Sequence, residues 1–368
     1  MTMASRFWPR LWVLARALPS VLVRQRVRPI EVRRILIAHH LLLGDTIMLA
    51  PLLKKLRGRY PSADIVMLCN SAYVPLYDMK PYGVMALPYN PRSLASHRAL
   101  ARESGFDLAL IPGDNRWSWI ARALGASWVV AFAPDRPSYK DWPVDEFVRF
   151  PETAEAWGDT ATRLIEGSFD AQFELGEWQA PMNSPYDLPS SPYCVLHLGA
   201  SSPHKLWPAA NWQTLASWAV SRGFNIVLSS GKGEEALLRE LDPQINFHHF
   251  AGTLDLAQLW HLLANAAFVV CPDTGIAHLA RIVGAPTVAL FGPGSPIVSG
   301  PGRFWRHSPF VPVWIEEIAC RDQSLLFERD LRWVRHCWRS PRECGNPVCM
   351  KNIEVEQIFG ALTRLGVM

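Results

Sequence analysis

Short apolar runs alternate with segments of helical periodicity along most of this chain of 368 residues. The runs predict strands near residues 35–38, 65–69, 107–111, 128–132, 193–198, 225–229, 268–271 and 287–291. Strands that alternate with helices are typical of α/β proteins with parallel sheets. A chain of this length suits two such domains, and the polar, proline-bearing stretch Gly176 to Pro192 is the predicted boundary.

The overall composition describes a folded chain. Apolar residues make up 49% of the sequence and charged residues 19%, which excludes a disordered chain. The formal net charge of +4 fits an acidic or phosphorylated substrate without requiring one.

A tight polar turn follows the apolar run Phe268 to Cys271. Asp273, Thr274 and Gly275 open a predicted helix, and His278 lies one turn further on. A helix N-terminus offers unpaired backbone N–H groups and a positive dipole end, so the turn suits a phosphate group. In the simpler interpretation, Asp273 is only an N-cap and His278 is only its partner.

A second turn with similar chemistry follows the predicted strand Tyr193 to Leu198. Ser201, Ser202 and Lys205 gather in the loop that leads to a helix predicted from Ala209 to Arg222. Hydroxyl groups and one ammonium are suitable donors for a diphosphate. Taken alone, Lys205 would be a solvated loop lysine, but two such turns in one half of the chain favour a binding site.

The third segment lies near the start of the chain. A strand is followed by the loop His39 to Asp45, and a helix is predicted from Thr46 to Arg59 with a core stripe at Ile47, Ala50, Leu53 and Leu56. Asp45 follows Gly44 at the junction between loop and helix. A carboxylate at this place is an N-cap, a catalytic base or both.

These segments together resemble glycosyltransferase family 9, the heptosyltransferases that build the inner core of bacterial lipopolysaccharide. Four matching pieces follow one another along residues 33 to 295. The first is the loop with Gly44-Asp45 and the helix that ends in Tyr60-Pro61, and the second is Leu198 to Pro208. The third is Leu228 to Glu234 with Phe250 to Thr253, and the fourth is Asp273 to Ala280 with Leu290 to Pro293. Each piece is weak by itself, and the four in order are a strong signal.

The resemblance implies a GT-B architecture, in which two doubly wound, Rossmann-like domains face a cleft that holds the active site. The predicted parts are a basic segment at 1–30, an acceptor-side domain at 31–180, a nucleotide-sugar domain at 190–352 and a final helix at 353–368. The resemblance also implies that this final helix packs back toward the first domain.

The same resemblance implies an inverting glycosyltransferase that needs neither a metal nor another cofactor. The expected donor is a nucleotide-diphospho-sugar, most simply ADP-heptose, and the expected acceptor is a glycolipid of the lipopolysaccharide-core type. Asp45 is the expected general base, and Lys205 with the turn at Asp273–Gly275 stabilises the leaving diphosphate. Glu234 reaches the nucleoside, or else it is a solvated residue at a helix start.

The chain departs from the family pattern in two places. His39 stands where family members usually have Arg or Lys, which changes the contacts expected for acceptor phosphates and makes them pH-dependent. Adjacent histidines at a strand end point to opposite faces, so His39 and His40 do not predict a metal site. The stretch Pro134 to Gly158 shows no recognisable acceptor pattern, although Arg136, Lys140 and Arg149 supply positive charge.

The first thirty residues contain six arginines and no acidic residue. Apolar side chains at helical spacing (Phe7, Leu11, Leu14, Leu18 and Leu22) predict an amphipathic helix that binds an anionic membrane surface. The pattern is too interrupted to span a membrane or to act as a signal peptide. We therefore expect a cytoplasmic enzyme on the inner membrane; in the alternative, the helix packs on the protein itself.

Seven cysteines are present. Cys69, Cys194 and Cys271 fall within predicted strands and are expected to be buried. Cys320, Cys337, Cys344 and Cys349 cluster near the end without the spacing of paired metal-binding motifs, and a zinc knuckle remains a minor alternative.

Two other functions remain open from the sequence. The chain could be another enzyme of the same fold, such as a nucleotide-sugar epimerase or a transferase that builds a different surface glycan. It could also be an inactive relative that binds a nucleotide or glycan. Asp45 and Lys205 favour the transferase over both.

Overall fold

The computed structural model describes residues 4–22 and 26–367, with side chains from residue 7 onward. The chain forms two compact units. Unit 1 comprises residues 1–153, 158–171 and 325–331, and unit 2 comprises 154–157, 172–324 and 332–368. The boundary near residue 171 precedes the predicted stretch Gly176 to Pro192, which belongs to unit 2.

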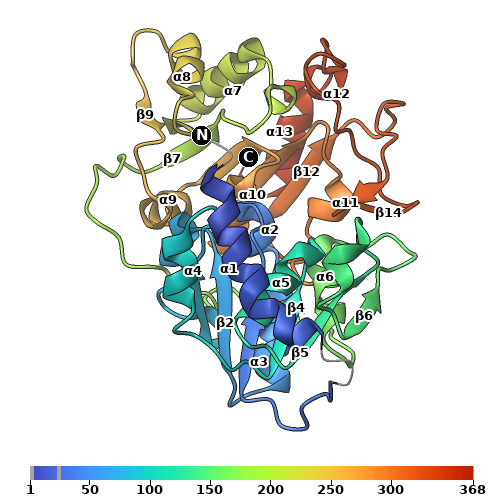
Figure 1. Cartoon of the computed structure of the whole chain (residues 1–368). Coiled ribbons are helices and arrows are strands. Elements are labelled where there is room, and N and C mark those ends of the chain that lie inside the picture. Colours follow the sequence, from blue (N-terminus) through green and yellow to red (C-terminus); the bar gives the residue numbers. More distant parts are fainter. Residues whose placement is uncertain (1–3, 23–25, 368) are drawn as a thin grey trace. The chain divides into compact units, whose positions relative to one another are not determined.

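Unit 1 is built on a parallel sheet in the order β3-β2-β1-β4-β5-β6 (Figure 1). Its strands are β1 (Arg34–Ile37), β2 (Asp64–Cys69), β3 (Val84–Pro88), β4 (Leu108–Ile111), β5 (Trp128–Ala133) and β6 (Glu146–Arg149). The helices in this part of the chain are α1 (Ala4–Val21), α2 (Leu43–Ile47), α3 (Ala50–Arg59), α4 (Leu94–Leu100), α5 (Ser118–Ala123) and α6 (Trp157–Ala161). The small hairpin of β13 (Leu325–Leu326) and β14 (Arg329–Asp330) also belongs to this unit.

Unit 2 repeats this plan with a parallel sheet in the order β12-β11-β10-β7-β8-β9. Its strands are β7 (Tyr193–His197), β8 (Asn225–Ser230), β9 (His248–Ala251), β10 (Phe268–Pro272), β11 (Thr287–Phe291) and β12 (Phe310–Trp314). Its helices are α7 (Ala209–Ser221), α8 (Glu235–Leu241), α9 (Leu256–Ala264), α10 (Gly275–Ile282), α11 (Pro296–Ser299), α12 (Val348–Lys351) and α13 (Val355–Arg364). The predicted α/β class and the two doubly wound sheets are confirmed.

In each sheet, the order in which successive strands are added changes direction once. In unit 1 the strands run from β1 outward to β3, and β4 then starts again on the other side of β1. In unit 2, β10 starts again beside β7 in the same way. Such switch points leave a crevice at the carboxyl ends of the two central strands, where open α/β sheets bind ligands.

The predicted helix from Thr46 to Arg59 is two helices. α2 begins at Leu43, and a turn at residues 48–49 separates it from α3, which starts at Ala50 with Pro51 in its first turn. Proline at this position costs no hydrogen bond and fixes a helical φ angle, so a new helix begins there. The predicted core stripe is confirmed, since Ile47, Ala50, Leu53 and Leu56 are all fully buried.

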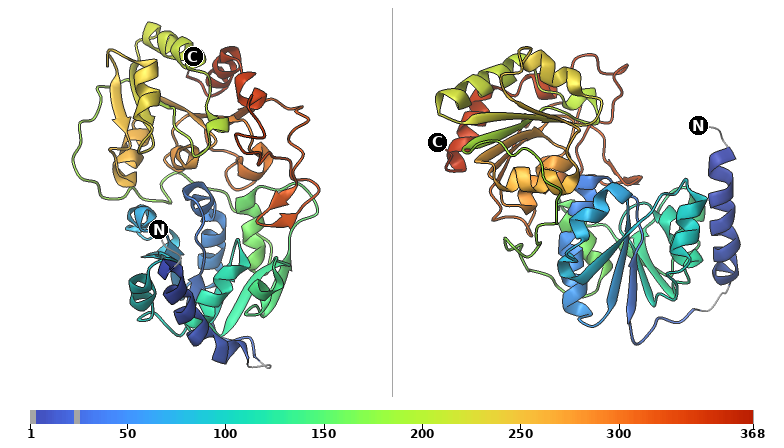
Figure 2. Two further views of the ribbon diagram at one scale, coloured as in Figure 1. Left: turned by 45° about the horizontal axis from the view of Figure 1, so that its top comes forward. Right: turned by 90° about the vertical axis from the view of Figure 1, so that its left-hand side faces the viewer.

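The final helix, α13, belongs to unit 2, and its packing toward the first domain stays a prediction. Its apolar face enters the core of the unit 2 sheet through Val355, Ile358, Ala361 and Leu362. The same core holds Trp212 and Leu215 of α7, so α7 and α13 cover one face together (Figure 2). Burial of these side chains accounts for the position of the helix.

Helix α1 forms an outer layer of unit 1 and packs on α4 and α5 (Figure 2). Ala17 is fully buried in the unit 1 core, and Trp12, Val13 and Val21 pack against the same cluster. Nε of Arg16 donates to the carbonyl oxygen of Ala123 at 3.0 Å. One face of α1 is therefore docked on the protein, as the alternative interpretation of this segment held.

Candidate functional site

The predicted donor-site residues of unit 2 follow the carboxyl ends of neighbouring strands. Ser201, Ser202 and Lys205 follow β7, Glu234 follows β8, and Asp273 to Gly275 follow β10. Because β7 and β10 are paired at the switch point, the two turns singled out by the sequence meet at one edge of the sheet.

Lys205 and Asp273 join these two turns directly. Nζ of Lys205 donates to the backbone carbonyl oxygen of Asp273 at 2.6 Å and to its carboxylate Oδ2 at 3.2 Å. The Lys205 side chain keeps 23% of its surface exposed, whereas the Asp273 side chain keeps 9%. Lys205 is therefore fixed in place by Asp273, and part of its side chain still reaches solvent.

Thr274 is the N-cap residue of α10, and its side chain makes no capping hydrogen bond. Its hydroxyl oxygen is buried and has no hydrogen-bond partner among the described residues. A buried hydroxyl without a partner carries a free-energy cost unless a ligand or water satisfies it. The hydroxyl and the free N–H groups at the start of α10 are thus suited to an anion.

His278 lies behind this turn and is 4% exposed. Burial lowers the pKa of His278 well below its usual value, and the nearby Arg281 and Lys205 charges lower it further. The Arg281 guanidinium donates to Nδ1 of His278. The ring is therefore neutral with its proton on Nε2, and it acts as a hydrogen-bond donor and not as a cation.

Arg281 is a residue that the sequence analysis missed. It is fully buried, and its guanidinium lies 5.1 Å from the ring centroid of Trp305 and 4.8 Å from that of Phe310. A cation between two aromatic faces is stabilised by their π electrons. The signal was an arginine three residues after His278, on the same side of a helix with an otherwise apolar face.

The Glu234 carboxylate connects the loops that follow β7 and β8. Its Oε2 accepts the N–H of Gly231 at 2.7 Å, and its Oε1 accepts the N–H of Ala200 at 3.1 Å. The structure thus places Glu234 as a residue that orders the loops of the site. A Cβ at Gly199 would lie 2.1 Å from Oε2 of Glu234, so only glycine fits beside this carboxylate.

The two serines of the first turn differ in their surroundings. Ser202 is the N-cap of the short 3-10 helix at Pro203–Lys205, and its hydroxyl accepts the N–H of His204 at 3.3 Å. Ser201 is exposed. Both lie in the loop that carries Lys205, as predicted.

In unit 1, Gly44 and Asp45 lie within helix α2. The N-cap residue is Leu42, and Asp45 stands in the first turn, so the interpretation of Asp45 as the N-cap is wrong. A carboxylate in the first turn of a helix is stabilised by the positive end of the helix dipole. Asp45 is half-buried and follows β1 at the switch point of its sheet.

His39 is fully buried, which differs from the prediction that it contacts the substrate. Its Nδ1 accepts the N–H of Leu41 at 3.2 Å, and burial lowers its pKa to about 3. His40 points elsewhere, with its ring centroid 5.8 Å from Trp117 and 6.2 Å from Tyr89. The ring of His39 therefore stays neutral at physiological pH and lies beneath the surface of the loop.

Within residues 4–22 and 26–367, no group of three or more His, Cys, Asp or Glu side chains is arranged to hold a metal ion. Cys69, Cys194 and Cys271 are buried in strands, as predicted. The four cysteines near the end are free thiols in the structure, and Sγ of Cys337 accepts a hydrogen bond from Arg339 at 3.6 Å.

Comparison with known proteins finds similar chains among glycosyltransferases. The model of glycosyltransferase family 9 (heptosyltransferase) matches residues 169–304. Lipopolysaccharide heptosyltransferase 1 of Pseudomonas aeruginosa is 29% identical over 216 residues, covering 56% of this chain and 60% of that protein. Lipopolysaccharide heptosyltransferase 2 of Salmonella typhimurium is 26% identical over 295 residues, covering 70% of this chain and 82% of that protein.

Solved structures show the same fold. The Escherichia coli ADP-heptose lipopolysaccharide heptosyltransferase II has a TM-score of 0.66 at 21% identity, covering 90% of this chain and 98% of that one. A family 9 glycosyltransferase from Veillonella parvula has a TM-score of 0.70 at 17% identity, covering 92% and 98%. This likeness establishes the GT-B fold, with one doubly wound domain in each unit. In sequence, the similarity to glycosyltransferase family 9 covers residues 169–304, most of them in unit 2.

Proposed function

We propose that this protein is an inverting, metal-independent glycosyltransferase that moves heptose from ADP-heptose onto a glycolipid of the lipopolysaccharide-core type. The observation that carries the proposal is the pair of linked turns at the switch point of unit 2, where Lys205 bonds to Asp273 beside the buried, unpartnered hydroxyl of Thr274. This arrangement suits the diphosphate of a nucleotide-sugar.

The relatives support the choice of sugar and acceptor. The matched proteins of Pseudomonas aeruginosa and Salmonella typhimurium are lipopolysaccharide heptosyltransferases, and a solved Escherichia coli heptosyltransferase contains ADP. The match covers 60% of the length of the Pseudomonas protein. The donor and the acceptor proposed for this chain are therefore those that the names of its relatives indicate, and both can be tested directly.

In the proposed reaction, an acceptor hydroxyl attacks the anomeric carbon of the donor sugar. The bond between that carbon and the diphosphate oxygen breaks, and ADP leaves with the electron pair. The Lys205 ammonium, the start of α10 and the Nε2–H of His278 stabilise the charge that develops on the diphosphate. Asp45 takes the proton of the hydroxyl as general base. Attack from the face opposite the leaving group inverts the anomeric centre.

Helix α1 is the proposed contact with the cytoplasmic face of the inner membrane. No helix in the described parts of the chain is long and apolar enough to cross a bilayer. The side of α1 that faces away from α5 exposes the large apolar side chains Phe7, Trp8, Leu11, Leu14 and Leu18. Arg16, Arg26 and Arg28 bond within the protein, and Arg10 is exposed beside the apolar stripe. An amphipathic helix of this kind binds at the headgroup layer of anionic lipids.

The direct test of the donor site is a thermal-shift panel with ADP, UDP, GDP and CDP, each with EDTA and with Mg²⁺. A ligand that binds only the native state raises the Tm by mass action. We expect selective stabilisation by ADP that EDTA does not weaken. Stabilisation by UDP or GDP alone would move the function to another transferase or epimerase of this fold. No response to any nucleotide would refute the donor site.

A further inference from the structure

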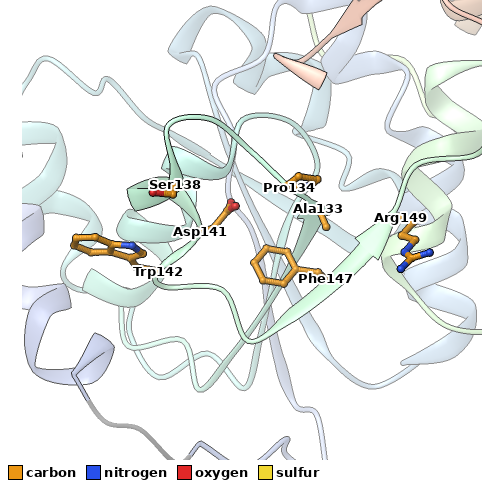
Figure 3. A pocket seen from close by; sticks show the side chains of 7 residues that line it. All are labelled: Ala133, Pro134, Ser138, Asp141, Trp142, Phe147 and Arg149. Carbon is orange, nitrogen blue, oxygen red and sulfur yellow. The ribbon is translucent and has the colours of Figure 1, made fainter. Parts of the chain in front are cut away.

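Unit 1 has an open pocket of about 630 Å³ that the donor chemistry does not use (Figure 3). It is lined by Ala133, Pro134, Ser138, Asp141, Trp142, Phe147 and Arg149. These residues come from the end of β5, from the loop that follows it and from the edge strand β6. The pocket falls in the stretch whose sequence shows no recognisable acceptor pattern.

Two aromatic side chains of the pocket are unusually exposed. Trp142 is 61% exposed and Phe147 is 45% exposed. Exposed aromatic side chains that line a hollow offer apolar contact area to a ligand. Because the faces of aromatic rings carry partial negative charge, they attract the polarised C–H groups on one side of a sugar ring.

The polar groups of the pocket are held in fixed positions. Asp141 Oδ1 accepts from the side-chain amide of Asn115 at 2.6 Å, and its Oδ2 accepts the N–H of Asp135 at 3.1 Å. A carboxylate has about four acceptor sites, so Asp141 keeps the capacity to accept from sugar hydroxyls. Arg149 is exposed and stands two residues after Phe147 on β6, so both side chains lie on one face of the sheet.

Buried contacts hold the loop that carries Ser138, Asp141 and Trp142. Nζ of Lys140 lies 3.1 Å from carboxylate oxygens of both Asp114 and Asp135. Nε1 of Trp119 donates to the carbonyl oxygen of Tyr139 at 3.0 Å, and its ring lies 6.4 Å from that of Trp142. The loop is thus built before any ligand arrives, which reduces the entropy cost of binding.

We propose that this pocket binds a sugar ring that carries an anionic group, a phosphate or a carboxylate. Trp142 and Phe147 contact the apolar face of the ring, Asp141 accepts its hydroxyls, and Arg149 pairs with the anion. The inference rests on the proposed function, in which unit 1 receives the acceptor, and it assigns a binding subsite to an anionic sugar of that acceptor.

The experiment uses mannose 6-phosphate as the probe, with mannose and inorganic phosphate as partial probes. Binding of the two sugars is followed by saturation-transfer NMR in the presence of saturating ADP, so that the donor site is already filled. Inorganic phosphate has no C–H protons, so its binding is followed by its competition with mannose 6-phosphate. The variants are Trp142→Ala and Arg149→Gln. The matched controls are Trp338→Ala, at a tryptophan that is 71% exposed in unit 2, and Arg342→Gln, at an exposed arginine of unit 2.

We expect mannose 6-phosphate to bind more tightly than mannose or phosphate alone. Trp142→Ala and Arg149→Gln should each weaken that binding at least tenfold, while the two control variants change it less than twofold. Absence of binding, or binding that neither variant weakens, would overturn the proposal. The ADP-induced thermal shift on the same variants separates the two claims, because it persists if only the subsite is wrong and is absent if the proposed function is wrong.

Discussion

Lys205 is the residue on which the donor site most depends, because it joins both turns and carries the only fixed cation that the sequence predicted there. Replacement by methionine keeps the length of the side chain and removes the charge. We expect Lys205→Met to weaken ADP binding at least tenfold, since a charge-assisted hydrogen bond contributes about 1.5–3 kcal/mol. Titration calorimetry measures the loss. Lys351→Met, at an exposed lysine of α12, is the control and should leave the ADP affinity unchanged.

The buried histidines predict how stability depends on pH. Burial lowers the pKa of His39 to about 3 and that of His197 to about 4, and that of His278 falls well below its usual value. The unfolded chain takes up these protons near pH 6.5 while the folded chain does not. The free energy of unfolding therefore falls as the pH drops below 6.5.

Each of these histidines contributes up to about 1.4 kcal/mol per pH unit to that slope. We predict that His39→Asn, which keeps an acceptor for the N–H of Leu41, reduces the slope between pH 6.5 and 4.5 by about one proton. Urea unfolding across this range gives the slope. The exposed His248 provides the control, and an equal change in His248→Gln would contradict the account.

The sequence predicted which residues come together at the candidate site better than it predicted their surroundings. Asp273, Thr274, Lys205 and the serines all meet at one edge of the unit 2 sheet, because parallel strands end at the same edge. Burial depends on neighbours that are distant in the chain, so the neutral state of His39 could not be predicted. The position of Arg281 between Trp305 and Phe310 depends on the same kind of packing.

Whether a strand could be predicted from the sequence depends on its place in the sheet. All eight predicted strands are present, and each has a neighbouring strand on both sides. Within the two six-stranded sheets, the four missed strands, β3, β6, β9 and β12, are the edges; the short hairpin strands β13 and β14 were also missed. Edge strands are partly exposed, so they tolerate charged residues and proline, as in Glu146–Arg149 and Phe310–Trp314. Their periodicity is correspondingly weak.

The loop after β7 depends on a glycine that has no room for a side chain. A Cβ at Gly199 would lie 2.1 Å from Oε2 of Glu234 and 2.9 Å from the backbone nitrogen of Gly231. We predict that Gly199→Ala lowers the free energy of unfolding by about 1–3 kcal/mol, as overpacking does, and weakens ADP binding. Thermal unfolding measures the first effect and calorimetry the second.

A glycine in α13 provides the opposite control. A Cβ at Gly360 would meet no atom within 4 Å, so Gly360→Ala should stabilise the protein by about 0.5–1 kcal/mol through helix propensity. If Gly199→Ala were as stable as the wild type, the tight contact with Glu234 would not exist in solution.

Helix α1 has two faces with different predicted roles. The exposed face contains Leu11 and Leu14, and the docked face contains Ala17. We predict that Leu11→Gln with Leu14→Gln reduces binding to vesicles of anionic phospholipid several-fold and leaves the Tm unchanged. Sedimentation with the vesicles measures the binding. Ala17→Gln should instead lower the Tm, because the larger side chain has no space in the unit 1 core.

For the whole molecule, the chain repeats one plan in two units and places its candidate chemistry at the switch point of each. The α/β class and the division into two units could be predicted from length and alternation. The assignment of α13 to unit 2 could not, because an amphipathic helix can cover any apolar face that is open to it. The local sequence pattern also does not predict that residues 325–331 belong to unit 1. This placement depends on contacts with distant residues, because Arg329 donates to the carbonyl oxygens of Gly113 and Phe132.

Transfer itself is the measurement that tests the central claim most directly. The purified protein is incubated with ADP-heptose and heptose-deficient lipopolysaccharide in the presence of EDTA, and mass spectrometry follows both products. The account predicts that the acceptor gains the mass of one heptosyl residue, which is heptose less one water, for each ADP released, and that Asp45→Asn abolishes the gain while ADP binding persists. An acceptor that gains no mass under these conditions, from a protein that binds ADP, would contradict the proposed reaction.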